Sequence, residues 1–346
     1  ALGRRVCSRS SLRSLCALGV SVVCLRFFTE LLEMRTEWSR GLAAGLLAVV
    51  FGAGAARPQN WTYQTFPFAR DCRVLDAVDA RTVFVYGWQN DGTAAIFPTT
   101  DGGETWEAFP WQGYAVCDLS ATDSNHVWAV SYRRIYHSTD GGRTWQVQYD
   151  NADSAVHMFD YIEMFDSLWG VAVGDAPERK PIPILHTDDG GATWYNVNDT
   201  SFVGAHLSDV WRSVDFVSPQ VGYLRYAYFG VPVVNFFLQK TVDGGASWSA
   251  TPLSADRFNI VRFYDESFGL AAWRGDTPVY RTADGGRTWT VHPFDFGDEW
   301  VLDIEFVPAE PSQVLALVGN SLLFSADSAR TWAVVGTPND RPLRDL

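Results

Sequence analysis

The stretch Thr99-Thr100-Asp101-Gly102-Gly103-Glu104-Thr105-Trp106 decides the fold of this chain, because close copies of it recur along most of the sequence. Five further segments align with it: Ser138 to Trp145, Thr187 to Trp194, Thr241 to Trp248, Thr282 to Trp289 and Ser325 to Trp332. Their tryptophans are separated by 39, 49, 54, 41 and 43 positions. Such a period is typical of a four-stranded propeller blade. The sequence therefore predicts an all-β fold, a β-propeller of four-stranded antiparallel blades.

The segments between the motifs support strands rather than helices. Short apolar runs such as Val127–Val130 and Val314–Val318 lack the 3.6-residue period that a helical repeat would need. Within one unit we expect an antiparallel meander of four strands, at Ile260–Tyr264, Gly269–Trp273, Val279–Arg281 and Thr288–His292.

The motif has a physical logic of its own. Its Asp can accept hydrogen bonds from nearby backbone amides, and the glycines that follow supply positive φ. The Trp begins the closing strand, where we expect its indole to cover the turn and pack on the next sheet face. In the last copy Ser328-Ala329 replaces the glycine pair, which predicts a strained or altered turn. We assign structural roles to the Asp and Trp residues of all copies: Asp101, Trp106, Asp140, Trp145, Asp189, Trp194, Asp243, Trp248, Asp284, Trp289, Asp327 and Trp332.

The number of blades depends on one short segment near the beginning of the repeat region. Six motifs and six opening strands predict six blades, with Trp61–Phe66 pairing near the C-terminal strand to close the ring. The same segment also resembles a closing strand by itself, and a blade shared between the termini would then make seven.

Composition limits the partners of the protein. Of 346 residues, 47% are hydrophobic and 14% aromatic, which is enough for a large core, and the formal net charge is −13. Without residues 1–56 the chain keeps 20 basic and 37 acidic residues. A surface of that sign repels phosphate backbones and anionic lipids, so we expect no nucleic acid partner.

The beginning of the chain is typical of a targeting sequence. From Met34, the residues Arg35 and Arg40, an apolar run at Gly41–Gly52 and small residues up to Ala56 match a secretory signal at 34–56. Residues 1–33 are either an upstream extension of the reading frame or part of an organelle presequence. Both alternatives predict export of a single propeller domain, residues 57–346, to a periplasmic, extracellular or thylakoid-lumen-like compartment. The apolar run is too short to span a bilayer.

Two cysteines remain after residue 56. Cys72 and Cys117 form either one disulfide between neighbouring inner strands, which would suit an exported protein, or two buried thiols.

The repeated motif resembles the Asp-box, or bacterial neuraminidase repeat, over roughly Trp61 to Pro338. Within that class the blades look most like those of the photosystem II stability/assembly factor family and its bacterial relatives. The matching pieces are Val127–Val130, Phe165–Gly174, Phe216–Leu224 and Phe263–Ala271. The resemblance implies a non-enzymatic, exported scaffold, without cofactors, that assists the assembly or stability of a larger complex. We expect a monomer whose partner is a protein of a membrane or envelope complex.

A secreted glycoside hydrolase of sialidase-like type is the alternative. A sialidase resemblance would require Arg-Ile-Pro ahead of the first Asp-box, and that signature is absent from the sequence. The 37 acids after residue 56 leave a pair of catalytic carboxylates open. No zinc-protease, Cys-x-x-Cys, nucleophile-elbow or phosphate-loop motif occurs, so we predict no catalytic and no metal site. The histidines are scattered singly and are typical of surface or packing residues: His126, His137, His157, His186, His206 and His292.

Two groups of residues are candidates for binding. The opening strands align one polar position that would line the central channel and form a mostly acidic ring for a cation or a basic partner: Asp76, Asp118, Asp160, Asp215, Arg262 and Asp303. Alternatively, each Asp only bonds backbone where a blade begins. The longest repeat unit also carries aromatic residues that either dock a partner or pack within the blade: Tyr223, Tyr226, Tyr228, Phe229, Phe236 and Phe237.

Overall fold

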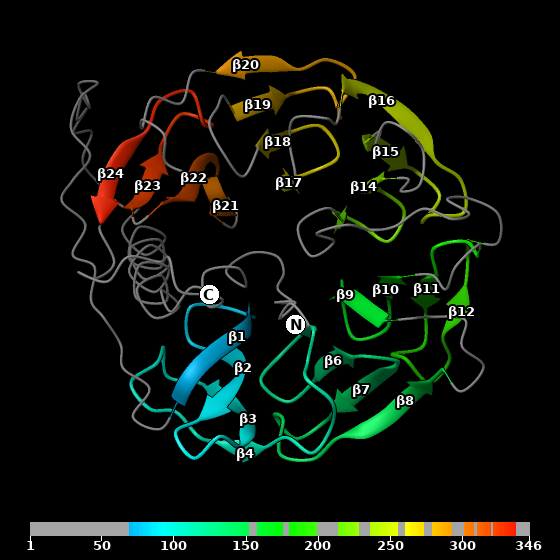
Figure 1. The fold of residues 1–346 in the computed structure, drawn as a ribbon, viewed down its shortest axis with the longest axis vertical. Helices are drawn as coiled ribbons and strands as arrows, with labels where there is room; N and C mark the ends of the chain where they lie inside the picture. The colour runs from blue at the N-terminus through cyan, green and yellow to red at the C-terminus, as the bar shows by residue number, and fades with distance from the viewer. Residues whose placement is uncertain are drawn as a thin grey trace, which may run out of the picture.

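The protein is a six-bladed β-propeller. The computed structural model describes residues 69–151, 158–175, 180–198, 214–227, 236–254, 260–272, 279–292, 301–307, 310–319 and 321–336. These residues form six four-stranded antiparallel sheets arranged around a central axis (Figure 1). We number the sheets as blades 1 to 6 in chain order. The prediction of an all-β propeller is confirmed.

Each blade is a meander of four consecutive strands, with the first strand nearest the axis and the fourth at the rim (Figure 1). In blades 1 to 3 the strands are β1 (Ala69–Ala77), β2 (Val83–Gln89), β3 (Ala94–Thr99), β4 (Phe109–Pro110), β5 (Asp118–Ala121), β6 (Val127–Ser131), β7 (Arg134–Ser138), β8 (Gln146–Asp150), β9 (Met158–Met164), β10 (Gly170–Asp175), β11 (Ile184–Thr187) and β12 (Tyr195–Asn196). In blades 4 to 6 they are β13 (Val214–Phe216), β14 (Gly222–Ala227), β15 (Phe236–Thr241), β16 (Ser249–Ser254), β17 (Ile260–Phe263), β18 (Gly269–Ala272), β19 (Val279–Thr282), β20 (Thr290–His292), β21 (Val301–Val307), β22 (Glu310–Val318), β23 (Ser321–Ser325) and β24 (Ala333–Gly336).

The burial of the strands follows from their place in the blade. β6 and β18 are buried along their whole length, because a second strand has a neighbouring blade on each face. Their sequences are accordingly apolar without alternation, apart from Ser131 at the end of β6. The fourth strand β8 is exposed or half-buried throughout, and its sequence is correspondingly polar.

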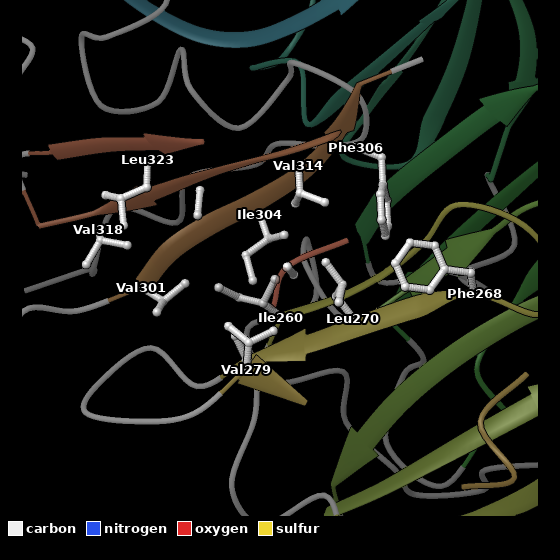
Figure 2. Packing of buried hydrophobic residues seen from close by; sticks show 13 residues of the cluster. Ile260, Phe268, Leu270, Val279, Val301, Ile304, Phe306, Val314, Val318 and Leu323 are labelled. Atoms are coloured by element: carbon white, nitrogen blue, oxygen red, sulfur yellow. The ribbon is translucent and has the colours of Figure 1, made fainter. Parts of the chain in front are cut away.

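The hydrophobic core is divided among the interfaces between consecutive blades. One cluster joins Leu270 and Ile260 of blade 5 to Ile304, Val314 and Val318 of blade 6, and Figure 2 shows these side chains pointing toward one another from the facing sheets. Comparable clusters fill the four interfaces from blade 1 to blade 5. Burial of such aliphatic side chains stabilises each interface by about 1.5–3 kcal/mol per residue.

Most sequence expectations about the fold hold. The strands of blade 5 lie within a few residues of their predicted bounds, and the described sheets number six. The segment Trp61–Phe66, the predicted signal at 34–56 and residues 1–33 lie outside the described residues. Within the described part of the chain, no helix has the length and apolar character needed to cross a membrane.

Candidate functional site

The Asp-box turns connect the third and fourth strands of each blade through one repeated hydrogen-bond network. In all six copies the Ser/Thr hydroxyl that opens the motif donates to Asp Oδ1 over 2.7–2.9 Å. Four residues after the Asp, a Thr or Ser donates its N–H to Oδ1 over 2.8–2.9 Å. The hydroxyl of that same residue donates to Oδ2 over 2.5–2.7 Å. Each carboxylate is therefore occupied with holding its own turn.

These hydrogen bonds lower the pKa of the Asp-box carboxyls. For Asp284, the Thr288 hydroxyl and backbone N–H lower the pKa from 3.8 to about 2. For Asp101, burial raises the pKa, but the bonds from Thr105 and Thr99 outweigh it and bring the value to about 2. The folded state therefore favours the ionised carboxylates.

The sixth copy keeps the same turn without glycines. Ser328 and Ala329 have φ of 62° and 65°, the left-handed values that the glycine pairs adopt in the other copies. The network imposes this conformation, since Ala329 N–H donates to the Ser325 hydroxyl like the glycines that it replaces. The turn is thus unaltered in shape, and it carries backbone strain, because L-residues disfavour positive φ.

The Asp-box indoles pack at the interface with the preceding blade, whereas we expected the next sheet face. Trp145 of blade 2 contacts the cluster that includes Ile96 of blade 1, and its ring meets Trp111 edge-on at 5.1 Å. Its Nε1–H donates to the Gly142 carbonyl over 3.0 Å. The motif therefore also links consecutive blades.

All six predicted inner positions are buried, at no more than 5% exposure, on the first strands of the blades. Three carboxylates accept main-chain N–H groups of the following blade. Asp76 accepts from Ala121 over 2.6 Å, and Asp118 accepts from Ile162 over 3.0 Å. Asp215 accepts in the same way from Phe263. These contacts favour the structural interpretation of the three carboxylates; binding of a partner or cation at this ring stays a prediction.

Arg262 occupies the same position in blade 5 and forms a buried ion cluster. Its Nε donates to Glu305 over 2.9 Å, and its Nη2 lies 3.5 Å from Asp303. Burial raises the pKa of Glu305 to about 7, against the opposing effect of the Arg262 charge. The sequence analysis missed Glu305, although it lies two residues after Asp303 and therefore on the same face of β21.

The structure describes only some of the remaining residues that the sequence analysis singled out. Cys117 is buried, but the side chain of Cys72 lies outside the described residues, so the disulfide stays a prediction. Tyr228 and Phe229 also lie outside them, as do the side chains of Tyr226, Phe236 and Phe237. Tyr223 is fully buried and stacks on Phe263, so this aromatic residue packs within the core. No cluster of metal-ligating side chains occurs among the described residues.

A surface patch that the sequence analysis missed lies at the other end of the strands from the Asp-box turns. Tyr114 is 65% exposed in the loop between blades 1 and 2, and its ring lies 5.3 Å from that of Tyr132. The Arg133 guanidinium stands over the Tyr132 ring at 5.2 Å. We call Tyr114, Tyr132 and Arg133 the tyrosine patch.

The backbone beneath the tyrosine patch is strained. Ser131 pairs with Arg134, which leaves Tyr132 and Arg133 as a two-residue hairpin turn. Tyr132 has φ of 49°, at a turn position where glycine is usual. Its carbonyl accepts Phe159 N–H of blade 3 over 2.6 Å, and Ser131 Oγ donates to the Tyr114 carbonyl over 2.7 Å. Glycine is the usual residue at such a turn position. The tyrosine at this position was therefore the feature of the sequence that could have indicated the patch.

The fold and its six repeated turns define an Asp-box β-propeller. Residues 136–147 match the family model of the BNR/Asp-box repeat. A search of curated proteins found no match.

Solved structures that share this fold include YCF48 and GH74 enzymes. A structure of YCF48 bound to a D1 peptide has a TM-score of 0.61 and 18% identity, over 80% of this chain and 84% of that one. YCF48 from Cyanidioschyzon merolae has a TM-score of 0.56 and 19% identity, over 78% and 86%. The GH74 xyloglucanase from Xanthomonas campestris has a TM-score of 0.55 and 17% identity, over 77% of this chain but 45% of the enzyme. The chain is therefore a propeller structurally similar to YCF48, and identities at this level show the shared fold alone.

Proposed function

We propose that this propeller is an exported, non-enzymatic scaffold that binds an extended segment of a partner protein at the tyrosine patch. Its role is to assist the assembly or stability of a larger membrane or envelope complex. The observation that carries the proposal is the exposed Tyr114–Tyr132 pair held on a strained turn. Strained backbone at a surface persists where the surroundings impose it, and it gathers at binding sites.

The chemistry of the patch suits a peptide. Tyr and Arg are enriched where proteins meet, because each combines a flat apolar surface with hydrogen-bonding groups. Among the described ion pairs, Arg134 binds Asp150 and Arg143 binds Glu107, whereas Arg133 pairs with no carboxylate. Arg133 is thus able to receive a carboxylate of the bound segment. The structure of YCF48 with a D1 peptide supports a peptide as the kind of ligand that a propeller of this shape takes.

A glycoside hydrolase is the second candidate, because GH74 enzymes share the fold. Against it stands the environment of the carboxylates that we described. Asp118 and Asp215 are engaged by main-chain N–H groups, and Glu305 is engaged by Arg262. A glycosidase needs two carboxyl groups facing a sugar site.

The experiment is site-specific photo-crosslinking from the patch in the protein's own envelope fraction. A photoreactive residue replaces Tyr114, and the control replaces Val242, which is equally exposed at 67% on an Asp-box turn. We expect one defined protein to crosslink at position 114 and not at position 242. Equal crosslinking at both positions would refute the tyrosine patch as the binding site.

The companion variant is Tyr132→Gly. Glycine tolerates the φ of 49°, so we expect the variant to fold with unchanged or higher stability and to lose the partner. Retained binding would overturn the proposal. A glycosidase panel with xyloglucan and a sialoside is run beside it, and turnover that is lost on substitution of a single carboxylate would establish the hydrolase instead.

A further inference from the structure

The residue just before each Asp-box faces the Asp-box of the following blade in four consecutive blades. This position, at the end of the third strand, is occupied by His137, His186, Lys240 and Arg281 in blades 2 to 5. Each of these four interfaces therefore carries a titratable residue at this position, and two of the four carry histidine.

The last two of these interfaces use permanent cations. Lys240 Nζ of blade 4 donates to the Glu266 carbonyl over 3.2 Å and lies 3.5 Å from the Gly285 carbonyl of blade 5. Arg281 of blade 5 lies over the Phe268 ring at 4.7 Å, within electrostatic reach of Arg330 in the Asp-box of blade 6. A cation suits the first of these places because backbone carbonyls face it.

His186 fills the interface between blades 3 and 4 as a buried ring, exposed by 7%. Its Cε1 would stand 2.6 Å from a Cβ placed on Gly244, so the ring lies directly against the Asp-box of blade 4. Tyr195 and Phe216 supply the other ring neighbours. Its Nε2 is buried and has no hydrogen-bond partner among the described residues. The polar group that opposes the effect of this burial is the backbone of Gly244.

His137 acts at the interface between blades 2 and 3 through Gln148. The ring stacks on Trp128 at 4.0 Å, and its Nδ1 lies 3.2 Å from Gln148 Nε2. Gln148 Nε2 also donates to the Gly190 carbonyl of blade 3 over 2.9 Å, and its Oε1 accepts from Trp128. Nε2 of His137 is likewise buried and unpartnered within the described part of the chain.

We propose that the interfaces between blades 2 and 3 and between blades 3 and 4 form an acid-sensitive device, in which protonation of His137 and His186 loosens the contact with the following blade. A proton on His137 Nδ1 would oppose the amide donor of Gln148. In both rings the positive charge would also be shared with a buried Nε2 that has no hydrogen-bond partner among the described residues, and burying a charged group in this way costs free energy.

The direction of the effect follows from the surroundings of both rings. Burial, and then the charge of His126, lowers the pKa of His137 from 6.5 to about 4, and Asp123 opposes this only in part. Burial also lowers the pKa of His186, and the Gly244 backbone opposes it. The opened interface binds protons that the closed one excludes. Its stability is therefore complete above pH 6.5 and is lost as the pH falls toward the folded-state pKa.

The test is amide hydrogen exchange of the full chain between pH 7 and pH 5, corrected for the intrinsic rate of each amide. For each histidine, the opening constant rises by up to about tenfold per pH unit in this window. We expect protection to fall in residues 187–194 and 241–248 and to stay constant in 282–289, where Lys240 makes the contact. Equal loss in all three segments, or none in the first two, would overturn the proposal.

Substitutions at the histidine and lysine positions make the test more specific. Lys240→His should bring acid sensitivity to residues 282–289, and His186→Gln should remove it from 241–248. His292→Gln, outside these interfaces, should leave the pattern unchanged. If a variant fails to fold, NMR titration of the wild-type rings decides the matter. Titration of His137 and His186 below pH 6.5 supports the device, and titration at or above that value refutes it.

Discussion

The outer Asp-box turns and the inner strands both contain aspartates that accept hydrogen bonds, but the donors lie at different distances along the sequence. At the rim, Asp140 bonds Ser138 and Thr144, all within eight residues of sequence. Near the axis, Asp118 bonds Ile162, which lies 44 residues away in another blade. A local network works in any blade and can be repeated unchanged. An inner contact depends on its neighbour, so blade 5 can replace the aspartate by Arg262 when blade 6 supplies Asp303 and Glu305.

The largest expected effect is at the inner ion cluster. Arg262→Met leaves the carboxylates of Asp303 and Glu305 buried without this guanidinium, and we expect a loss of about 3–5 kcal/mol in the free energy of unfolding. The matched rim substitution is Arg143→Met, which removes an exposed ion pair with Glu107 and should cost about 0–1 kcal/mol. Urea denaturation measures both, and similar losses would break the comparison.

Removal of one aspartate from each region compares a contact between two blades with a contact inside one turn. Asp118→Ala leaves the N–H groups of Ile162 and Leu119 buried and without this acceptor, so we expect a loss of about 2–3 kcal/mol. Asp140→Ala frees the N–H and hydroxyl of Thr144, which water can reach, together with the buried Ser138 hydroxyl, and we expect a loss of about 1 kcal/mol. Hydrogen exchange should show opening between blades 2 and 3 for the first variant and in one turn for the second. Opening confined to blade 2 in both would contradict this view.

The two regions should respond to pH with opposite signs. The raised pKa of Glu305 means that its folded state holds a proton more tightly than the unfolded chain does. Its contribution to stability therefore falls as the pH rises from about 4.5 to about 7, by at most about 1.4 kcal/mol per pH unit. The lowered pKa of Asp101 gives a contribution that is present above pH 3.8 and is lost as the pH falls toward 2. The difference in unfolding free energy between wild type and Glu305→Gln, followed against pH, isolates the first effect, and a difference that rises with pH would contradict it.

The smallest expected effect concerns the strained sixth turn. Ser328→Gly relieves the strain of a φ of 62° at this position. Because glycine also raises the conformational entropy of the unfolded chain, we expect a net stabilisation of about 0.5 kcal/mol. Gly285→Ala places a methyl group at φ of 71° in an intact copy and should destabilise it. Thermal unfolding of the pair measures the difference, and the same sign in both would show that the network tolerates either residue.

The repeat explains why most of the fold could be predicted. Each Asp-box closes its turn through residues at most four positions apart, so the motif alone fixes where a third strand ends and a fourth begins. The spacing of the six copies then indicates the blades. The direction of indole packing was not predictable, since the Trp can face either neighbour and only the assembled ring places Trp145 beside Trp111.

Less of the candidate sites than of the fold could be predicted from the sequence. Glu305 becomes important only because β21 lies beside β17, and the tyrosine patch exists only because a loop at Tyr114 meets a hairpin at Tyr132. The sequence by itself determined the turn chemistry and the strand order, because these follow from contacts within one blade, and the repeat aligned the polar position of the first strands. Only the tertiary structure decided which groups those polar side chains bond and which aromatic rings reach the surface. The first depends on the packing of segments more than forty residues apart in the chain, such as Asp118 and Ile162, and the second on a loop and a hairpin turn that meet only in the folded protein.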